Sequence, residues 1–291
     1  MAMFIQKPWY KSSGGGGLKI VSFTDGTDDE ISAMLDAYYN DEITWAEMGW
    51  AVGDTRKIHL NSFDCPNPFS SYSVAAQEIT VVIVAHDHTP LATSINGHTN
   101  ACITVNFRET LGSDSYNGKD GSMYLDGNSA KDTSFTKWSN LYARTYINST
   151  LLDAFSYSTD KGSGTSFKSL IKQSKHYRHT AYNTTESEEV TDTLFFPSYP
   201  EIFGTATYSY YKATNPIEGT QFEYYTNSSN RIKHNNNNGS PMSRASYWWQ
   251  GSCASYYSST NGYFWCGVTI GGASDCYNGA SASSLAPAWA M

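Results

Sequence analysis

The sequence predicts an α+β fold with two helices and a mostly antiparallel sheet. Two segments, about 28–40 and 134–147, show the apolar spacing of amphipathic helices. Several short segments around them are rich in β-branched and aromatic residues and end in Gly, Ser or Asn, as strands do. The 291 residues suffice for one large domain or two modest ones.

The N-terminal elements follow from local signals. Residues 1–17 are expected to be a flexible tail, because a run of four glycines loses too much entropy on ordering. A short strand at Leu18–Phe23 is expected next. Thr27 and Glu30 form a capping box, which predicts that a helix starts after Thr27. Its buried face would carry Ile31, Met34, Leu35 and Tyr38.

Apolar patterns predict the remaining core elements. Arg56–Leu60 is expected to be a strand, the apolar run Glu78–His86 a central buried strand, and Ala101–Arg108 a half-buried strand. A short strand is expected at Thr193–Phe196. The second helix would bury one face and stop at a break, Asn148–Thr150; that face is Trp138, Leu141, Tyr142 and Thr145.

Three polar stretches are expected to stay outside the core. Lys168–His179 holds three lysines and an arginine, and we interpret it as a solvated face. Tyr182–Asp192 is acidic and is interpreted as a surface loop. The asparagine tract Asn235–Asn238 is predicted to be absent from the core.

Composition narrows the class of function. A net charge of −8 argues against nucleic-acid binding, which needs a basic surface. Only 16% of residues are charged, whereas 22 are Tyr, a balance typical of extracellular recognition surfaces. The sequence contains no run of eighteen apolar residues, so we expect no membrane insertion. The first residues do not match a secretory signal, so we expect release by lysis, on a particle, or after loss of a leader.

Motifs for chemistry are scarce. The five cysteines form no CxxC pair, and their odd number prevents complete internal pairing. His86 and His88 could share a metal if the strand continued, but no further ligand is marked by spacing. Glu186–Glu189 is a carboxylate cluster on an expected loop, unsuited to a glycosidase pair. We therefore expect no enzyme activity, no metal and no cofactor.

The C-terminal segment, about 247–291, has an unusual composition. It contains no Lys, Arg or Glu, and Asp275 is its one acid. Its four Trp residues are expected to pack in the core, because their large area stabilises a scaffold. The Tyr residues between them are interpreted as exposed contacts, with inward packing as the alternative for each.

Short segments along most of the chain resemble one family, the C-type-lectin-fold variable proteins of diversity-generating retroelements from gut bacteria and phages. The segments are Thr24-Asp25-Gly26-Thr27, Trp50-Ala51-Val52-Gly53-Asp54-Thr55-Arg56, Ile95-Asn96-Gly97, Glu201-Ile202-Phe203-Gly204, Gly219-Thr220-Gln221-Phe222-Glu223-Tyr224-Tyr225, Asn230-Arg231-Ile232-Lys233, Tyr247-Trp248-Trp249 and Leu285-Ala286-Pro287. The family's usual Trp-Trp-x-Arg-Ser and its aromatic ending are altered here, at Gly251 and at Met291.

The resemblance implies a C-type-lectin-like fold whose C-terminal strand and loop region varies. In this family, error-prone copying of adenines in a template rewrites the 3′ end of the gene. The products include Tyr, Ser, Gly, Cys, Thr, Ile, Asp and Asn but exclude Lys, Glu, Gln, Met and Trp. The implied division of the chain is a tail at 1–17, an N-terminal strand and helix at 18–45, and a lectin-like domain at 46–291.

The resemblance also implies a receptor-recognition protein, such as a phage tail protein or bacterial surface adhesin. Its partner would be a host cell-surface protein or glycan, not nucleic acid, and oligomerisation is left open. The predicted ligand-binding positions are Gly251, Cys253, Ser255, Tyr256, Tyr257, Ser259, Tyr263, Gly267, Thr269, Ile270, Ser274, Asp275, Cys276, Tyr277 and Asn278.

Two other functions are considered. A calcium-dependent sugar lectin would need carboxylate and amide ligands in the C-terminal third, where Asp275 is the one acid after Tyr247. An enzyme of the formylglycine-generating type, which shares the fold, would need a placed cysteine pair. Three of the five cysteines, Cys253, Cys266 and Cys276, fall in the suspected variable segment.

Overall fold

The computed structural model describes residues 18–65, 72–111, 122–123, 137–155, 166–180, 187–204, 211, 218–237, 239–258, 262–278 and 283–291. The predicted tail, residues 1–17, lies outside them. The fold is mixed α+β with few helices, and its strand pairs are antiparallel except for one β13–β16 pair. Among the described helices, none is both long and apolar enough to span a bilayer.

The central sheet holds the core together. Its order is β1 (Thr55–Leu60), β4 (Gln77–His86), β7 (Ile103–Phe107) and β17 (Ala288–Ala290). β4 is central and buried along most of its length, as its apolar run predicts. β7 is buried on both faces, so the half-buried prediction is wrong: Thr104 and Asn106 lie inside as well. Asn106 is tolerated there because its amide donates to the carbonyl of Ala286 (2.8 Å).

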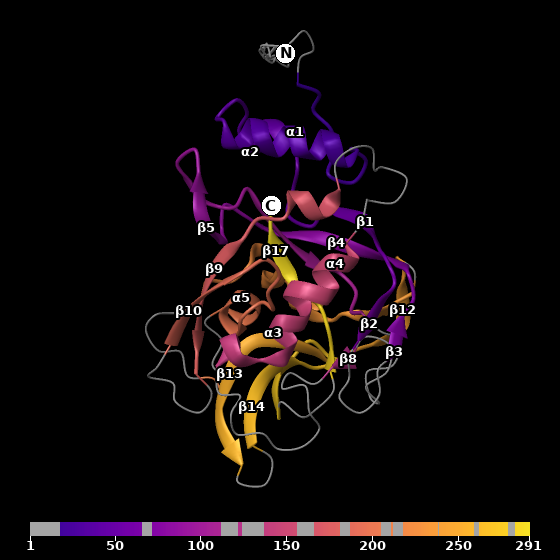
Figure 1. Ribbon diagram of the computed structural model, residues 1–291, viewed down its shortest axis with the longest axis vertical. Coiled ribbons are helices and arrows are strands. Elements are labelled where there is room, and N and C mark those ends of the chain that lie inside the picture. The colour runs from indigo at the N-terminus through magenta and orange to yellow at the C-terminus, as the bar shows by residue number, and fades with distance from the viewer. Residues whose placement is uncertain are drawn as a thin grey trace, which may run out of the picture.

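Helix α1 (Asp28–Tyr39) covers the end of the molecule opposite β13 and β14 (Figure 1). The predicted capping box is present, and Ile31, Met34 and Leu35 are buried, whereas Tyr38 is half-buried. A buried ion pair fixes the helix start: Arg56 Nη2 lies 2.6 Å from Asp28 Oδ1. The Tyr39 hydroxyl donates to the carbonyl of Met291 (2.9 Å), so α1 and the last residue are packed together. Helix α2 (Trp45–Met48) follows α1.

The predicted strand at Leu18–Phe23 does not form. Its backbone groups bond to side chains instead of a neighbouring strand: the Val21 amide donates to Met34 Sδ (3.3 Å) and the Val21 carbonyl accepts from Trp50 Nε1 (2.8 Å). The predicted strand at Thr193–Phe196 is also wrong. Only Phe195 pairs there, in an isolated bridge with Ala288.

A second sheet borders the central one. Its order is β10 (Ser187–Asp192), β9 (Ser174–His179), β5 (Pro90–Ile95) and β6 (His98–Asn100). β9 lies in the segment predicted to be solvated, and that prediction fails at Arg178, whose side chain is buried. β10 lies in the predicted acidic loop, whose first residues, 182–186, are outside the described part. The loop prediction fails because Val190 and Asp192 face inward.

The second helical segment continues through the predicted break at Asn148–Thr150, and its one interruption is the extended Leu141 between η1 and α3. It comprises η1 (Trp138–Asn140), α3 (Tyr142–Tyr146), a π-helical turn η2 (Ile147–Leu151) and α4 (Leu152–Ala154). Residues 134–136 lie outside the described part. Trp138 and Leu141 are buried as predicted, but Thr145 is exposed because the α-helix starts only at Tyr142.

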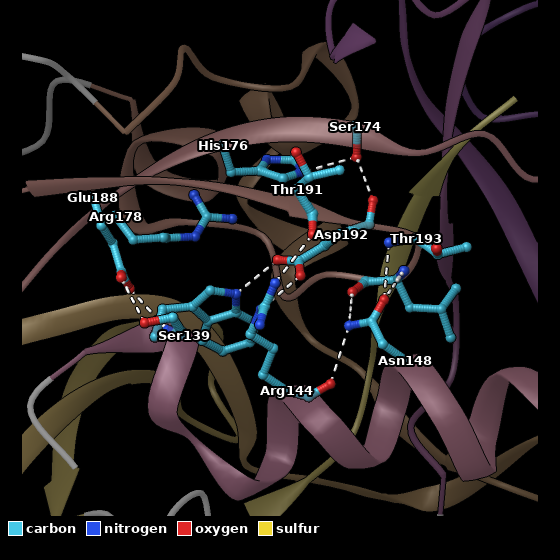
Figure 2. Close-up of polar contacts among 12 residues, drawn as sticks. Ser139, Arg144, Asn148, Ser174, His176, Arg178, Glu188, Thr191, Asp192 and Thr193 are labelled. Carbon is cyan, nitrogen blue, oxygen red and sulfur yellow. Dashed lines mark hydrogen bonds and ion pairs between the residues drawn. The ribbon is translucent and has the colours of Figure 1, made fainter. Parts of the chain in front are cut away.

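Polar side chains fasten this helical segment to β10 and to the residues that follow it (Figure 2). Asp192 accepts from Trp138 Nε1 and from Arg144 Nε, each at 2.7 Å. Burial raises the pKa of the Asp192 carboxyl, and Arg144 opposes that shift. The Asn148 side chain accepts from the amides of Thr193 (2.8 Å) and Leu194 (2.9 Å), so the predicted break is an anchor.

The remaining described elements are short. They are β2 (Phe63–Cys65), β3 (Tyr72–Val74), η3 (Phe167–Leu170), α5 (Tyr199–Phe203), η4 (Glu223–Thr226), η5 (Ser228–Arg231), β11 (His234–Asn236) and β12 (Pro241–Ala245). The first two residues of the asparagine tract enter the core, contrary to prediction, whereas Asn237 is exposed and Asn238 lies outside the described residues. Asn235 and Asn236 are buried because protein groups satisfy their amides; Asn236 Nδ2, for example, donates to the Glu78 carbonyl (2.7 Å).

Candidate ligand-binding face

The segment predicted to bind a ligand supplies four of the five strands of the C-terminal sheet, and its last strand, β17, belongs to the central sheet. The order of the C-terminal sheet is β15 (Ser274–Asn278), β14 (Gly262–Val268), β13 (Trp248–Ser258), β16 (Ser283–Ser284) and β8 (Ser122–Met123). β13 and β14 extend to the end of the molecule opposite α1 (Figure 1). The β13–β14 register shifts between Trp249 and Cys253 and again before Tyr257, as β-bulges do.

The four tryptophans of the segment are all buried, as predicted: Trp248, Trp249, Trp265 and Trp289. Trp248 Nε1 donates to the carbonyl of Arg231 (3.1 Å), which ties the start of β13 to η5. The buried Lys233 ammonium lies 5.0 Å from the Trp248 ring and donates to Asn106 Oδ1 (2.6 Å). These contacts make the first half of β13 part of the core.

Two predicted binding positions on β13, Gly251 and Cys253, are buried. A Cβ at Gly251 would lie 2.5 Å from the Phe196 carbonyl oxygen, so no side chain fits there without a backbone shift. The Gly251 amide also donates to the Pro197 carbonyl (2.9 Å), which holds β13 close to that segment. The Cys253 thiol is buried and donates to the His179 carbonyl (3.1 Å).

The buried carboxylate of Glu218 links β13 to β9. Glu218 Oε1 accepts from the His179 amide (2.8 Å), and its Oε2 accepts from Tyr211 (3.1 Å) and from the Ser252 hydroxyl. The Ser252 hydroxyl in turn accepts from the Tyr199 amide (2.7 Å) at the start of α5. Both carboxylate oxygens of Glu218 therefore accept hydrogen bonds from within the protein. Burial, with Glu218 nearby, raises the pKa of the Cys253 thiol, which stays protonated.

The β14–β15 turn is the most exposed described part of the face. Ile270 is 50% exposed, and Thr269 is half-buried. The turn is well ordered by its own bonds: the Thr269 amide donates to the Ala273 carbonyl (2.8 Å), and the Gly272 amide to the Thr269 carbonyl (2.9 Å). Gly272 has a φ of +77° and packs closely on Ile232. The turn is thus a rigid platform for the Ile270 side chain.

The edge strand β15 carries the other accessible predicted positions, which are half-buried: Ser274, Asp275, Cys276 and Tyr277. Asp275 Oδ1 accepts from the Cys276 amide (2.8 Å). The Tyr277 ring lies edge-on to Tyr247 (5.5 Å between centroids) and to Trp249 (5.9 Å), so part of its surface is used internally. Burial, with Asp275 nearby, raises the pKa of the Tyr277 hydroxyl.

Gly267 is also buried, which contradicts its predicted exposure. A Cβ there would meet the Tyr277 ring at 2.8 Å. Cys266 and Cys276 are directly opposite each other on β14 and β15, both as free thiols. Burial raises the pKa of the Cys266 thiol.

The remaining predicted positions stay predictions. Ser259 lies outside the described residues. For five others the strand backbone is described but the side chain is not: Ser255, Tyr256, Tyr257, Tyr263 and Asn278. Tyr257 pairs with Tyr263 in the β13–β14 register, near the tip of that strand pair.

Two residues bordering the face were missed by the sequence reasoning. Tyr247 is half-buried against Tyr277, and Ile232 is half-buried beneath Gly272. Tyr247 could have been found, because it directly precedes the buried tryptophan pair. Ile232 carries no local signal, since its contact is made by a turn 40 residues later in the chain.

The histidine pair does not form one site. Asp87 has a φ of +45°, so the strand ends at His86 and the chain turns before His88. His86 stacks on Trp45 (4.2 Å), whereas His88 Nε2 bonds to the Thr220 carbonyl (3.0 Å). Within the described part of the chain, no group of three or more His, Cys, Asp or Glu side chains could hold a metal ion.

Comparison with known proteins identifies a family but not an activity. No curated protein and no solved structure matches the chain. A family model described as a domain of unknown function (DUF6273) matches residues 111–288, which is more than half of the chain and contains the whole of β9, β10 and β13 to β15. The chain therefore belongs to the DUF6273 family.

Proposed function

We propose that this protein is a ligand-binding protein whose C-terminal sheet is a recognition surface diversified by a retroelement. The proposed ligand is a host cell-surface protein or glycan. The proposed location is a phage tail or a bacterial surface, and the proposed fold is C-type-lectin-like. The two helical segments and the mostly antiparallel sheets are compatible with that fold.

The observation that carries the proposal is the division of the sheet into two parts. The half of β13 that starts at Trp248 is buried and bonded to α5 and β9, whereas the β14–β15 turn and the β15 edge are accessible. Substitution on an exposed, self-bonded turn costs little stability. A surface that must accept many sequences needs such a scaffold beneath it.

The chemistry of the accessible part suits polar recognition without strong charge. Ile270 supplies apolar area, Tyr277 a partly exposed ring, and Asp275 the one formal charge of the segment. Such surfaces bind through rigid aromatic area and adaptable polar groups. The Cys253 and Cys266 thiols are buried with raised pKa values, a poor state for the cysteine chemistry of a formylglycine-generating enzyme.

The gene locus tests the diversification directly. We expect a near-identical repeat close to the 3′ end of the gene, differing mainly at adenines, beside a reverse-transcriptase gene. The differing codons should include those for Ile270 and Asp275 and should spare Trp248. A locus without such a repeat removes diversification from the proposal.

A display library tests the recognition surface itself. One library randomises Thr269, Ile270 and Ser274, and a matched library randomises three buried positions, Ser252, Cys253 and Val268. Most members of the first library should resist protease, and few of the second should. Equal losses in both libraries would mean that the turn is not a replaceable surface.

Calcium chelation before cell-binding assays separates the calcium-lectin alternative, since the proposed surface should bind without calcium.

A further inference from the structure

Two pockets share part of their lining. Their volumes are about 440 and 320 Å³, and both are lined by Arg108, Glu109 and Pro241. We call the two together the Arg108 cleft. The smaller pocket also carries Tyr224, Ile232 and Met242, which give it an apolar wall.

Glu109 has an unsatisfied acceptor in this cleft. Its side chain is 1% exposed, and Oε2 accepts from the Thr80 amide (3.1 Å). The other oxygen, Oε1, has no hydrogen-bond partner among the residues that the structure describes. A buried carboxylate oxygen without a donor is costly, so the site favours a ligand that brings a strong donor.

Arg108 supplies the opposite charge. Its side chain is exposed and takes part in no hydrogen bond or ion pair with the described residues. It lines the same two pockets as Glu109 but forms no ion pair with it. The cleft lining therefore brings together a guanidinium and a carboxylate that form no bond with each other.

The charges select the class of ligand. In the smaller pocket Arg108 and Glu109 supply the opposite charges, whereas the larger pocket also carries Arg56, Lys57 and Glu78. A simple cation in the smaller pocket would gain from Glu109 but be repelled by Arg108, and a simple anion would meet the reverse arrangement. A ligand with an ammonium group beside a carboxylate satisfies both, with charge-assisted hydrogen bonds at each end. Ile232 and Met242 offer apolar contact for a side chain.

We propose that the Arg108 cleft binds a free α-amino acid with an apolar side chain. Glu109 accepts from the ligand ammonium group, and Arg108 donates to its carboxylate. Both residues precede the suspected variable segment, so this site would be constant while the C-terminal face varies. The proposal does not depend on diversification.

Ligand-observed NMR on the full chain tests the site. The probes are L-leucine and two analogues that each lack one charge: 3-methylbutylamine and 4-methylpentanoate. We expect saturation transfer to L-leucine, with binding of each analogue about 10- to 100-fold weaker, the loss for one charge-assisted bond. Equal transfer to either analogue would overturn the zwitterion assignment, and no transfer to L-leucine would overturn the site.

Three variants assign the contacts. Glu109→Gln can keep an acceptor for the Thr80 amide while replacing the free oxygen with a donor, so it should fold and lose L-leucine binding by about 10- to 100-fold. Arg108→Ala, at an exposed position, should show a similar loss. Lys175→Ala, on β9, is the matched removal of a surface cation and should bind as the wild type does. Unchanged binding by Glu109→Gln or Arg108→Ala refutes the proposed roles; thermal melts of each variant confirm folding.

Discussion

Gly251 gives the sharpest test of the boundary between frame and face. In Gly251→Ala the new methyl carbon would lie 2.5 Å from the Phe196 carbonyl oxygen and 3.0 Å from Arg178 Nε. Relief of that overlap costs about 1–3 kcal/mol. It also strains the bond from the Gly251 amide to the Pro197 carbonyl, worth about 1 kcal/mol. The lower conformational entropy of the unfolded Ala variant offsets about 0.4–1 kcal/mol of this loss. A net loss of about 2 kcal/mol follows from these contributions.

Gly271 is the matched control within the same sheet. A Cβ there meets only Thr269 Oγ1, at 3.9 Å, and the residue is exposed. Gly271→Ala should change the free energy of unfolding by about 0.5 kcal/mol or less. Urea denaturation of both variants gives the two free energies of unfolding and their m-values. If the two variants unfold with the same free energy, β13 is not packed on Phe196 and Gly251 belongs to the replaceable surface after all.

Three further predictions concern the scaffold. Burial lowers the pKa of Lys233 to about 7. The unfolded chain therefore binds an extra proton above that pH, and stability should rise between pH 7 and 9 by up to about 1.4 kcal/mol per pH unit. Urea titrations should show this slope in the wild type and not in Lys233→Met. Arg56→Met leaves the Asp28 carboxylate buried without its cation and should cost about 3–5 kcal/mol in the same assay. Asn148→Ala removes the acceptor of the Thr193 and Leu194 amides and should lower the free energy of unfolding by about 1–3 kcal/mol, and the melting temperature with it. An unchanged melting temperature would show that water replaces the Asn148 acceptor.

Sequence alone could predict elements whose signals are local. The capping box of Thr27 and Glu30 lies at the start of the helix that it predicts. The apolar run of β4 is itself sufficient to predict a buried strand. The failures share a different cause. β10 was missed because its acidic residues bond to a distant helical segment, with Glu188 accepting from the Ser139 hydroxyl (2.6 Å). Asn235 was missed because the partner that makes its burial tolerable, Thr110, is 125 residues away.

The candidate site divides in the same way. The tryptophans could be assigned to the core because large apolar area is buried wherever the fold allows it. Gly251 could not be assigned from the sequence. A glycine that is required because another backbone segment packs against it cannot be distinguished, by sequence alone, from a glycine in an open turn. Only the position of Phe196, brought beside β13 by the fold, distinguishes it from Gly271.

This distinction limits what the proposed diversification could achieve. Adenine-directed copying can produce Gly and Cys, so the sequence rule admits change at both Gly251 and Cys253. Folding rejects most such changes, because one position faces a backbone carbonyl and the other is buried beside His179. The replaceable set is therefore the overlap of two conditions, codons open to the mechanism and side chains open to solvent. Among the described side chains that overlap centres on the β14–β15 turn and the β15 edge, so variants recovered from natural loci should differ most from Thr269 to Tyr277 and least from Trp248 to Ala254.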